Sequence, residues 1–232
     1  MTVLTAFLVD GGFFIKRYRA IFPNGKEDTP SQVATNLYDM LLRHIKPKKQ
    51  GPYQQLYRIF YYDCPPLTKK AHNPITGKAI DFSKSEEAIF RFTFYEELKK
   101  RRKVALRLGH LYDGHHWIIS LEKTKALLKK TITIDALNEE DIHYDVRQKG
   151  VDMKIGLDIA SLAYKHLVDQ IILIAGDSDF VPAAKLARRE GIDFILDPMW
   201  NPIHPDLHEH IDGLWSTCPK PKKKRNPTQG YL

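Results

Sequence analysis

Two unbroken runs of apolar, β-prone residues constrain the fold of this chain more than any other feature. They occupy residues 3–9 and 171–175. Neither run alternates with polar residues, which is typical of strands in a parallel sheet covered on both faces. Helical periodicity at 151–166 and 179–189 flanks the second run, and a further strand is predicted at 192–196. This succession predicts an α/β fold with three layers and a central, mostly parallel sheet.

The rest of the chain carries weaker signals. We expect a helix at 31–45, a strand at 56–62, a loop at 65–84, a helix at 85–100, a strand at 104–111 and a short helix at 205–214. Residues 113–138 fit either a hairpin or a short helix. A length of 232 residues suits one domain. We therefore expect a domain at 1–216, with a long insertion after the second strand at about 64–84 and another at about 112–140. A basic, disordered tail is expected at 217–232.

Charge and composition limit the classes of molecule that this chain is expected to bind. The net charge of +8 favours a polyanion such as nucleic acid, although many soluble proteins are basic for solubility alone. No apolar run has the roughly 20 residues of a membrane span. The first residues lack the basic and long apolar regions of a signal peptide, so we expect a cytoplasmic protein without membrane contact. Cys64 and Cys218 lie far apart, without the spacing of zinc ligands.

Aspartates follow the predicted strands. Asp10 ends the first apolar run, Asp177 and Asp179 follow the run at 171–175, and Asp63 ends the strand at 56–62 with a weaker signal. In open α/β sheets, ligands gather outside the carboxyl ends of the strands. Asp152, at the start of a helix, adds another acid. Crowded carboxylates are stable mainly when a hard divalent cation neutralises them, so we expect Mg²⁺ or Mn²⁺.

Each acid also has a purely structural interpretation. Asp179 fits a helix N-cap, and Asp152 fits a favourable charge at a helix N-terminus. Asp10 fits a turn residue before two glycines, and Asp63 fits a turn even better. These interpretations do not explain why such acids fall together on neighbouring strand ends.

Three motifs carry a resemblance to a known family. They are Asp10-Gly11-Gly12, Lys149-Gly150-Val151-Asp152 and Gly176-Asp177-Ser178-Asp179-Phe180. In this order and spacing they resemble the NYN-domain proteins, a branch of the PIN-like nucleases, over residues 3 to about 214. The resemblance implies a PIN-like (NYN) fold and a Mg²⁺-dependent nuclease centre, generally directed at RNA.

The resemblance also assigns site residues. Asp10, Asp152, Asp177 and Asp179 match the catalytic, metal-binding acids, and Asp158 matches a further metal acid. Candidate substrate-binding residues are Phe13, Lys16, Lys149 and Ser178. Phe13 would stack on a base unless it belongs to the core. Lys149 would meet a phosphate unless it is an ordinary surface lysine. Ser178 suits a hydrogen bond at the metal site or a helix cap.

We therefore expect a metal-dependent nuclease, in particular an endoribonuclease. The family often has a polar residue, commonly asparagine, where this chain has Gly12. This departure favours the alternative of an RNA-binding or regulatory module with a weak or silent site. A phosphatase-like enzyme is disfavoured because a glycine-rich phosphate loop is missing. His204 and His208 lie one helical turn apart, but without an acid–base motif they suit an ordinary helix. DNA remains a less favoured partner than RNA, and a homo-oligomer remains open.

Overall fold

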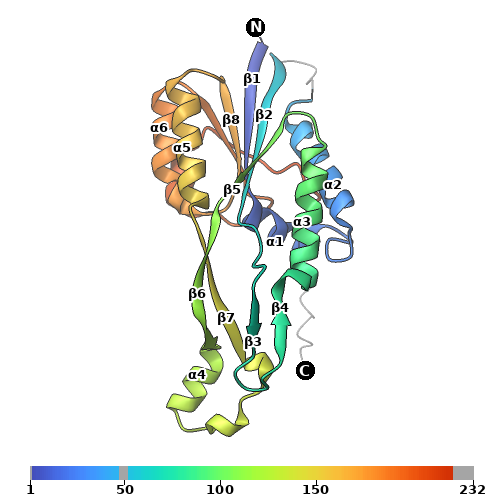
Figure 1. The fold of residues 1–232 in the computed structure, drawn as a ribbon. Helices are drawn as coiled ribbons and strands as arrows, with labels where there is room; N and C mark the ends of the chain where they lie inside the picture. The colour runs from blue at the N-terminus through green and yellow to red at the C-terminus, as the bar shows by residue number, and fades with distance from the viewer. Residues whose placement is uncertain (1, 47–51, 222–232) are drawn as a thin grey trace, which may run out of the picture.

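The computed structural model describes residues 2–46 and 52–221, which form an α/β core with a long projecting arm (Figure 1). The core contains a six-stranded sheet in the order β10-β9-β8-β1-β2-β5. The strands are β1 (Thr2–Asp10), β2 (Tyr53–Asp63), β5 (Val104–Leu108), β8 (Gln170–Ile174), β9 (Asp193–Asp197) and β10 (Gly213–Leu214). Every neighbouring pair in this sheet is parallel. The predicted α/β class is confirmed.

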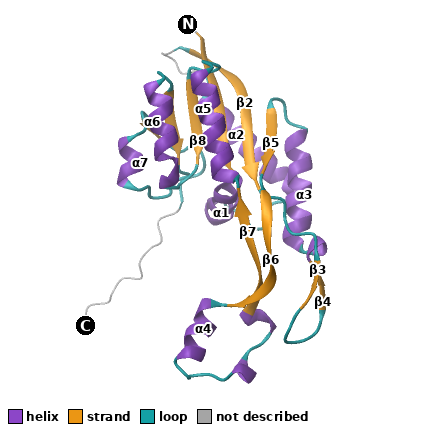
Figure 2. Ribbon diagram, turned by 60° about the vertical axis from the view of Figure 1, so that its left-hand side comes forward, coloured by secondary structure: helices purple, strands orange, loops and turns teal. Residues whose placement is uncertain are grey.

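Helices cover both faces of the sheet (Figures 1 and 2). One layer contains α1 (Gly11–Ile21), α2 (Pro30–His44) and α3 (Glu86–Lys99), and the other contains α5 (Val151–Tyr164) and α6 (Val181–Arg189). Successive residues of β1 alternate between them. Phe7 and Val9 pack in the core with α1, α2 and α3, whereas Ala6 and Leu8 pack in the core with α5 and α6. All four are fully buried, which explains why apolar residues on β1 do not alternate with polar ones.

The arm consists of two antiparallel hairpins beyond the carboxyl end of the sheet (Figure 1). Its elements are β3 (Lys70–His72), β4 (Ala79–Asp81), β6 (His110–Ile119), α4 (Leu121–Leu128) and β7 (Ile142–Lys149). The ring of Tyr144 lies 5.5 Å from the rings of both Phe82 and Trp117, which joins the hairpins. The prediction of a plain loop at 65–84 was therefore wrong. The segment at 113–138 contains both a strand and a helix.

The root of the arm is tightly packed. A Cβ atom at Gly109 would lie 2.7 Å from the carbonyl oxygen of Lys149, so β6 and β7 approach each other as closely as glycine allows. The Gly109 amide donates a hydrogen bond to the carbonyl of Asp63 (2.7 Å). The Cys64 thiol lies 3.5 Å and 3.9 Å from the carbonyl oxygens of His110 and Lys149. Three segments thus meet where the arm leaves the core.

The structure also corrects two boundaries near the carboxyl end of the chain. The helix predicted at 205–214 is shorter: α7 spans Pro205–Glu209, and Gly213–Leu214 pairs with β9. Asp212 holds this extended segment because its carboxylate accepts a hydrogen bond from the Phe194 amide (2.9 Å).

The tail predicted at 217–232 begins too early. Thr217 donates its hydroxyl hydrogen to the carbonyl of Met40 (2.8 Å), and the Trp200 indole donates to the carbonyl of Cys218 (3.1 Å). Cys218 is also buried, so the packed domain continues at least to this residue. Residues 222–232 lie outside the described part of the chain. Among the described helices, none combines the length and apolar character needed to cross a membrane.

Candidate active site

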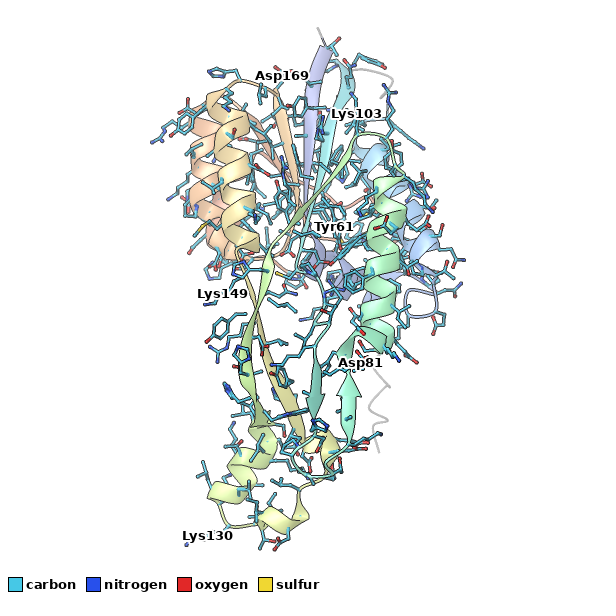
Figure 3. All side chains as sticks on the ribbon, in the orientation of Figure 1. Tyr61, Asp81, Lys103, Lys130, Lys149 and Asp169 are labelled. Carbon is cyan, nitrogen blue, oxygen red and sulfur yellow. The ribbon has the colours of Figure 1, made fainter. Side chains whose placement is uncertain are left out.

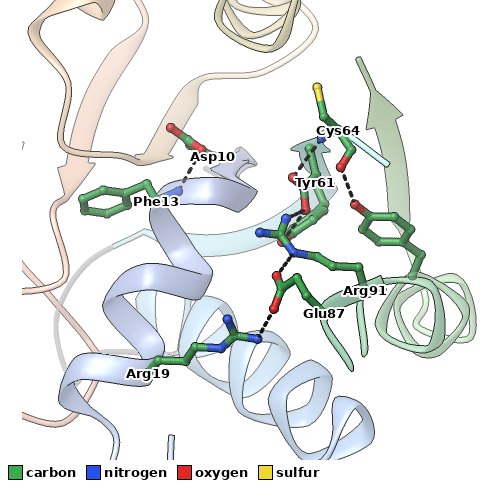
Figure 4. Close-up of polar contacts among 9 residues, drawn as sticks. Asp10, Phe13, Arg19, Tyr61, Cys64, Glu87 and Arg91 are labelled. Carbon is green, nitrogen blue, oxygen red and sulfur yellow. Dashed lines mark hydrogen bonds and ion pairs between the residues drawn. The ribbon is translucent and has the colours of Figure 1, made fainter. Parts of the chain in front are cut away.

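Asp10 stands at the carboxyl end of β1 and at once begins a helix. Its carboxylate accepts a hydrogen bond from the Phe13 amide (3.0 Å) and so caps α1 (Figure 4). The two glycines after Asp10, which fit a turn in the sequence, are the first residues of this helix. The helix N-terminus thereby directs its free amides toward the edge of the sheet where Asp10 lies.

Asp177 lies at the end of the neighbouring strand. β1 pairs with β8 through Val9 and Ile174, so the segments that follow both strands emerge side by side. The Asp177 carboxylate accepts a hydrogen bond from the Asp179 amide (3.0 Å) and caps the short 3-10 helix Ser178–Phe180. Both acids are therefore helix caps, whereas the structural interpretation expected a turn residue at Asp10 and a helix N-cap at Asp179. In both acids the cap engages the Oδ1 atom of the carboxylate.

Asp10 and Asp177 line one open pocket of about 430 Å³. Its lining residues are Asp10, Gly12, Phe13, Lys16, Gly176, Asp177, Ser178, Asn201 and His204. Three of the four candidate substrate-binding residues therefore line the pocket. The fourth, Lys149, is absent from this lining.

Asp152 lies on α5 and, like Asp179, does not line the pocket shared by Asp10 and Asp177. Gly150 adopts a left-handed conformation (φ 81°) that turns the chain from β7 into α5, and Asp152 lies in the first turn of that helix. Burial and the negative charges of Asp177 and Asp179 raise the pKa of the Asp152 carboxyl above its ordinary value. The charge of Asp152 is felt by Asp10 as well.

Asp10 has the most perturbed carboxyl of the region. Burial raises its pKa from 3.8 to about 6, and the charges of Asp152 and Asp63 contribute to the rise, against the lowering effect of the Phe13 hydrogen bond. The cause is loss of hydration next to other negative charges. A site of this kind favours an added cation over another anion.

The donors suit a hard divalent cation. They are carboxylates with one amide, from Asn201, and one imidazole, from His204, and Mg²⁺ and Mn²⁺ prefer oxygen ligands. Within the described residues, no group of three or more acids, histidines or cysteines is arranged so that it could hold a metal ion. Mg²⁺ typically keeps several waters and takes only one or two carboxylates from a protein.

The site can now be compared with known proteins. A model of the NYN domain matches residues 77–200, just over half of the chain. The chain belongs to the NYN domain family. A crystal structure of a protein of unknown function from Vibrio parahaemolyticus RIMD 2210633 has 15% sequence identity and a TM-score of 0.42, over 91% of each chain. No curated protein matches.

The family match contains the motifs with Asp152, Asp158, Asp177 and Asp179 but not Asp10. Asp10 reaches the NYN site through the pairing of β1 with β8. NYN domains are PIN-like, and PIN-like nucleases generally use divalent metals and act on nucleic acid. The predicted family and fold are thereby confirmed.

Asp158 is engaged in structural contacts on α5. Its carboxylate accepts hydrogen bonds from the hydroxyl of Tyr62 (2.7 Å) and from Nε of Arg107 (3.1 Å). It does not line the pocket with Asp10. These contacts tie α5 to β2 and β5, a role that sequence reasoning did not foresee.

Asp63 is also engaged in structural contacts. It is fully buried at the end of β2, and its carboxylate is 2.5 Å from the Arg91 guanidinium. Arg91 pairs with Glu87 (2.7 Å), and Glu87 pairs with Arg19 (2.8 Å), so the chain of ion pairs runs from β2 across α3 to α1 (Figure 4). Asp63 thus contributes to the site only through its charge.

The candidate substrate residues occupy different settings. A Cβ atom at Gly176 would lie 2.5 Å from the Phe13 ring, so this ring forms one wall of the pocket. Lys16 lines the pocket with it. Lys149 lies at the junction of the arm and α5 (Figure 3), with its ammonium 4.5 Å from the centre of the Tyr112 ring.

Sequence reasoning missed three polar residues near Asp10. Asn201 and His204 line the pocket from the segment after β9, and the Nδ1 atom of His204 caps α7. Strand-end logic applied to β9 identifies this segment, because β9 is parallel to β8. The third is Gln148: a Cβ atom at Gly12 would lie 3.7 Å from its side-chain oxygen. An amide from β7 is thus close to the position that lacks a side chain.

Proposed function

We propose that this chain is a Mg²⁺- or Mn²⁺-dependent nuclease, in particular an endoribonuclease that hydrolyses phosphodiester bonds of RNA. The observation that carries the proposal is the pocket shared by Asp10 and Asp177 from adjacent parallel strands. Asp152 supports it because its carboxyl pKa responds to the charges of Asp177 and Asp179. Asp152 is thus coupled by charge to Asp177 and Asp179, and Asp10 is coupled by charge to Asp152.

In this proposal Asp10, Asp152, Asp177 and Asp179 hold the metal. The cation, when bound, supplies charge neutralisation for the phosphodiester and for the crowded carboxylates. Lys16 binds a phosphate oxygen next to the acids, because it lines the same pocket. Ser178 and Asn201 add hydrogen-bonding groups for a phosphate or sugar. Asp158 has its contacts with Tyr62 and Arg107, so we propose that it positions α5 and with it Asp152.

The Phe13 ring gives the substrate an apolar surface beside these polar groups. The ring packs against Gly176 and lines the pocket, where a base would stack on it. Stacking of this kind tolerates any base. The net charge of +8 supports a nucleic-acid substrate. RNA is proposed over DNA because of the family resemblance, and the cytoplasm is the proposed location.

A cleavage assay tests the proposal. Purified full-length protein is incubated with labelled linear RNA, circular RNA and single-stranded DNA, with Mn²⁺, Mg²⁺ or EDTA. The variants are Asp10→Asn and Asp177→Asn, and Asp39→Asn, an exposed acid on α2, is the matched control. We expect metal-dependent cleavage of both RNAs, reduced about 100-fold or more in the two site variants. Cleavage of the circle identifies an endonuclease, because an exonuclease needs an end.

A second candidate function is an RNA-binding module without catalysis. The observation that favours it is the lack, among the described residues, of a group of three or more acids, histidines or cysteines that could hold a metal ion, together with Gly12. The same assay separates the two. RNA that is bound but never cut by folded wild-type protein, with any of the metals, refutes the nuclease and leaves the binding module.

A further inference from the structure

The end of the arm exposes an unusual number of large apolar side chains. We define the arm tip as α4, the turn of the β3–β4 hairpin at 73–77 and the segment at 131–140. The relative exposures are 70% for Leu121, 79% for Leu128, 69% for Ile134 and 43% for Ile75. Figure 1 places α4 at the end of the arm that is farthest from the sheet. Exposed apolar groups gathered in this way mark an interaction surface.

An apolar cavity lies in the same arm tip. It has a volume of about 400 Å³. Its lining residues are Pro74, Ile75, Trp117, Ile118, Ile119, Ile134, Asp135, Leu137 and Ile142. Both hairpins contribute to it. The arm tip therefore combines projecting leucines on α4 with a hollow of apolar character.

Charges of opposite sign accompany these two parts. α4 and the residues after it carry Lys125, Lys129 and Lys130, all exposed. Asp135 lines the cavity, and the exposed Glu139 and Glu140 line an adjoining groove that shares Trp117 with the cavity and also contains Lys78. Among the described residues, Lys123 and Asp141 form an ion pair nearby (3.4 Å), and none of these charged groups takes part in one. The basic part and the acidic part thus both remain available to a partner.

We infer that the arm tip binds the arm tip of a second copy of this chain, with the Leu128 side of each α4 seated at the cavity of the other. The apolar projection and the apolar cavity occur on one surface, and the projection is basic where the cavity is acidic. A two-fold contact needs such a self-complementary surface, because each copy must present both halves. The same contact removes exposed leucine from water on both copies.

This inference does not rest on the proposed function. The arm tip lies at the opposite end of the arm from the junction with α5, as the labels for Lys130 and Lys149 show (Figure 3). The substitutions that test it leave the acidic pocket untouched, so a failed cleavage assay leaves this inference intact. Likewise, a protein that stays monomeric leaves the proposed nuclease function intact.

Complementary charge reversal tests the contact. One variant combines Lys125→Glu with Lys129→Glu, which makes α4 acidic, and the other combines Asp135→Lys with Glu139→Lys, which makes the cavity basic. The control combines Lys26→Glu with Lys185→Glu, an equal charge change at exposed positions of the core. Sedimentation and light scattering give the mass of each full-length protein from about 1 to about 100 µM, the range expected for a small interface.

We expect wild type and control to form dimers, each at twice the chain mass of 26.9 kDa. Each charge-reversed variant alone is expected to remain a monomer because like charges then face each other in both halves of the contact. An equimolar mixture of the two variants is expected to restore the dimer. Recovery in the mixture also shows that the variants are folded. A wild type that stays monomeric throughout, variants that still dimerise, or a mixture that stays monomeric would overturn the inference.

Discussion

Replacing Asp10 by asparagine should stabilise the protein at neutral pH in the absence of divalent metal. Burial and neighbouring acids raise the pKa of this carboxyl from 3.8 to about 6 in the folded protein. The ionised form is therefore less stable when folded than when unfolded. Asparagine keeps the capping oxygen for the Phe13 amide but carries no charge. The substitution thus removes the unfavourable charge and keeps the hydrogen bond that begins α1.

The magnitude follows from the shift in pKa. A rise of roughly two units corresponds to about 3 kcal/mol, and we expect about 1 to 3 kcal/mol because the pocket is open to water. The folded pKa lies above the unfolded pKa, so this carboxyl lowers stability as the pH rises from about 4 to about 6. Below this range wild type and variant should be equally stable. Above it the variant should be more stable.

Urea unfolding followed by circular dichroism at pH 4 and pH 7.5 measures this difference. With EDTA present, Asp10→Asn should gain stability only at the higher pH, and the control Asp39→Asn should not. Saturating Mg²⁺ should reverse the order, because wild type then gains binding energy that the variant lacks. A variant that is less stable than wild type at pH 7.5 in EDTA would refute the reasoning and make Asp10 a purely structural acid.

Three other predictions concern single contacts. Arg91→Met should lower the free energy of unfolding by about 3 to 5 kcal/mol because it leaves the buried Asp63 charge unpaired, and adding Asp63→Asn should recover most of the loss in urea unfolding. Gly176→Ala should cost about 1 to 3 kcal/mol because the new Cβ atom meets the Phe13 ring at 2.5 Å, and a change in the aromatic circular dichroism should accompany it. Asp158→Asn should lower cleavage by no more than about 10-fold, less than the loss in the pocket variants, and an equal loss would place Asp158 among the metal ligands.

The sheet and its two main acids, Asp10 and Asp177, could be predicted from the sequence. The apolar runs identify the strands, and a general rule places ligands at the carboxyl ends of parallel strands. An unbroken apolar run predicts a buried parallel strand, and parallel strands bring their carboxyl ends to one edge. Asp10 and Asp177 accordingly line one pocket. The helix α1 was not predicted, because Gly11 and Gly12 are typical of turns. Its stability comes from the Asp10 cap and from the packing of Phe14 and Tyr18 in the core.

Other parts of the site depend on pairings that local pattern does not contain. Asp158 on α5 pairs with Arg107 on β5. Asp63 at the end of β2 pairs with Arg91 on α3. Both are set by the tertiary fold. Strand β7 was missed because its carboxyl-terminal half is polar on both faces. It becomes ordered by pairing with β6, and so the proximity of Gln148 to Gly12 could not be foreseen.

The tight root of the arm determines the spacing between two places on the molecule. Gly109 lies so close to the Lys149 carbonyl that a side chain would not fit between them. Its amide also donates a hydrogen bond to the Asp63 carbonyl, which belongs to the core. These contacts restrain the arm at the point where it leaves the core. In a dimer joined at the arm tips, the two arms would therefore set the spacing between the two acidic pockets.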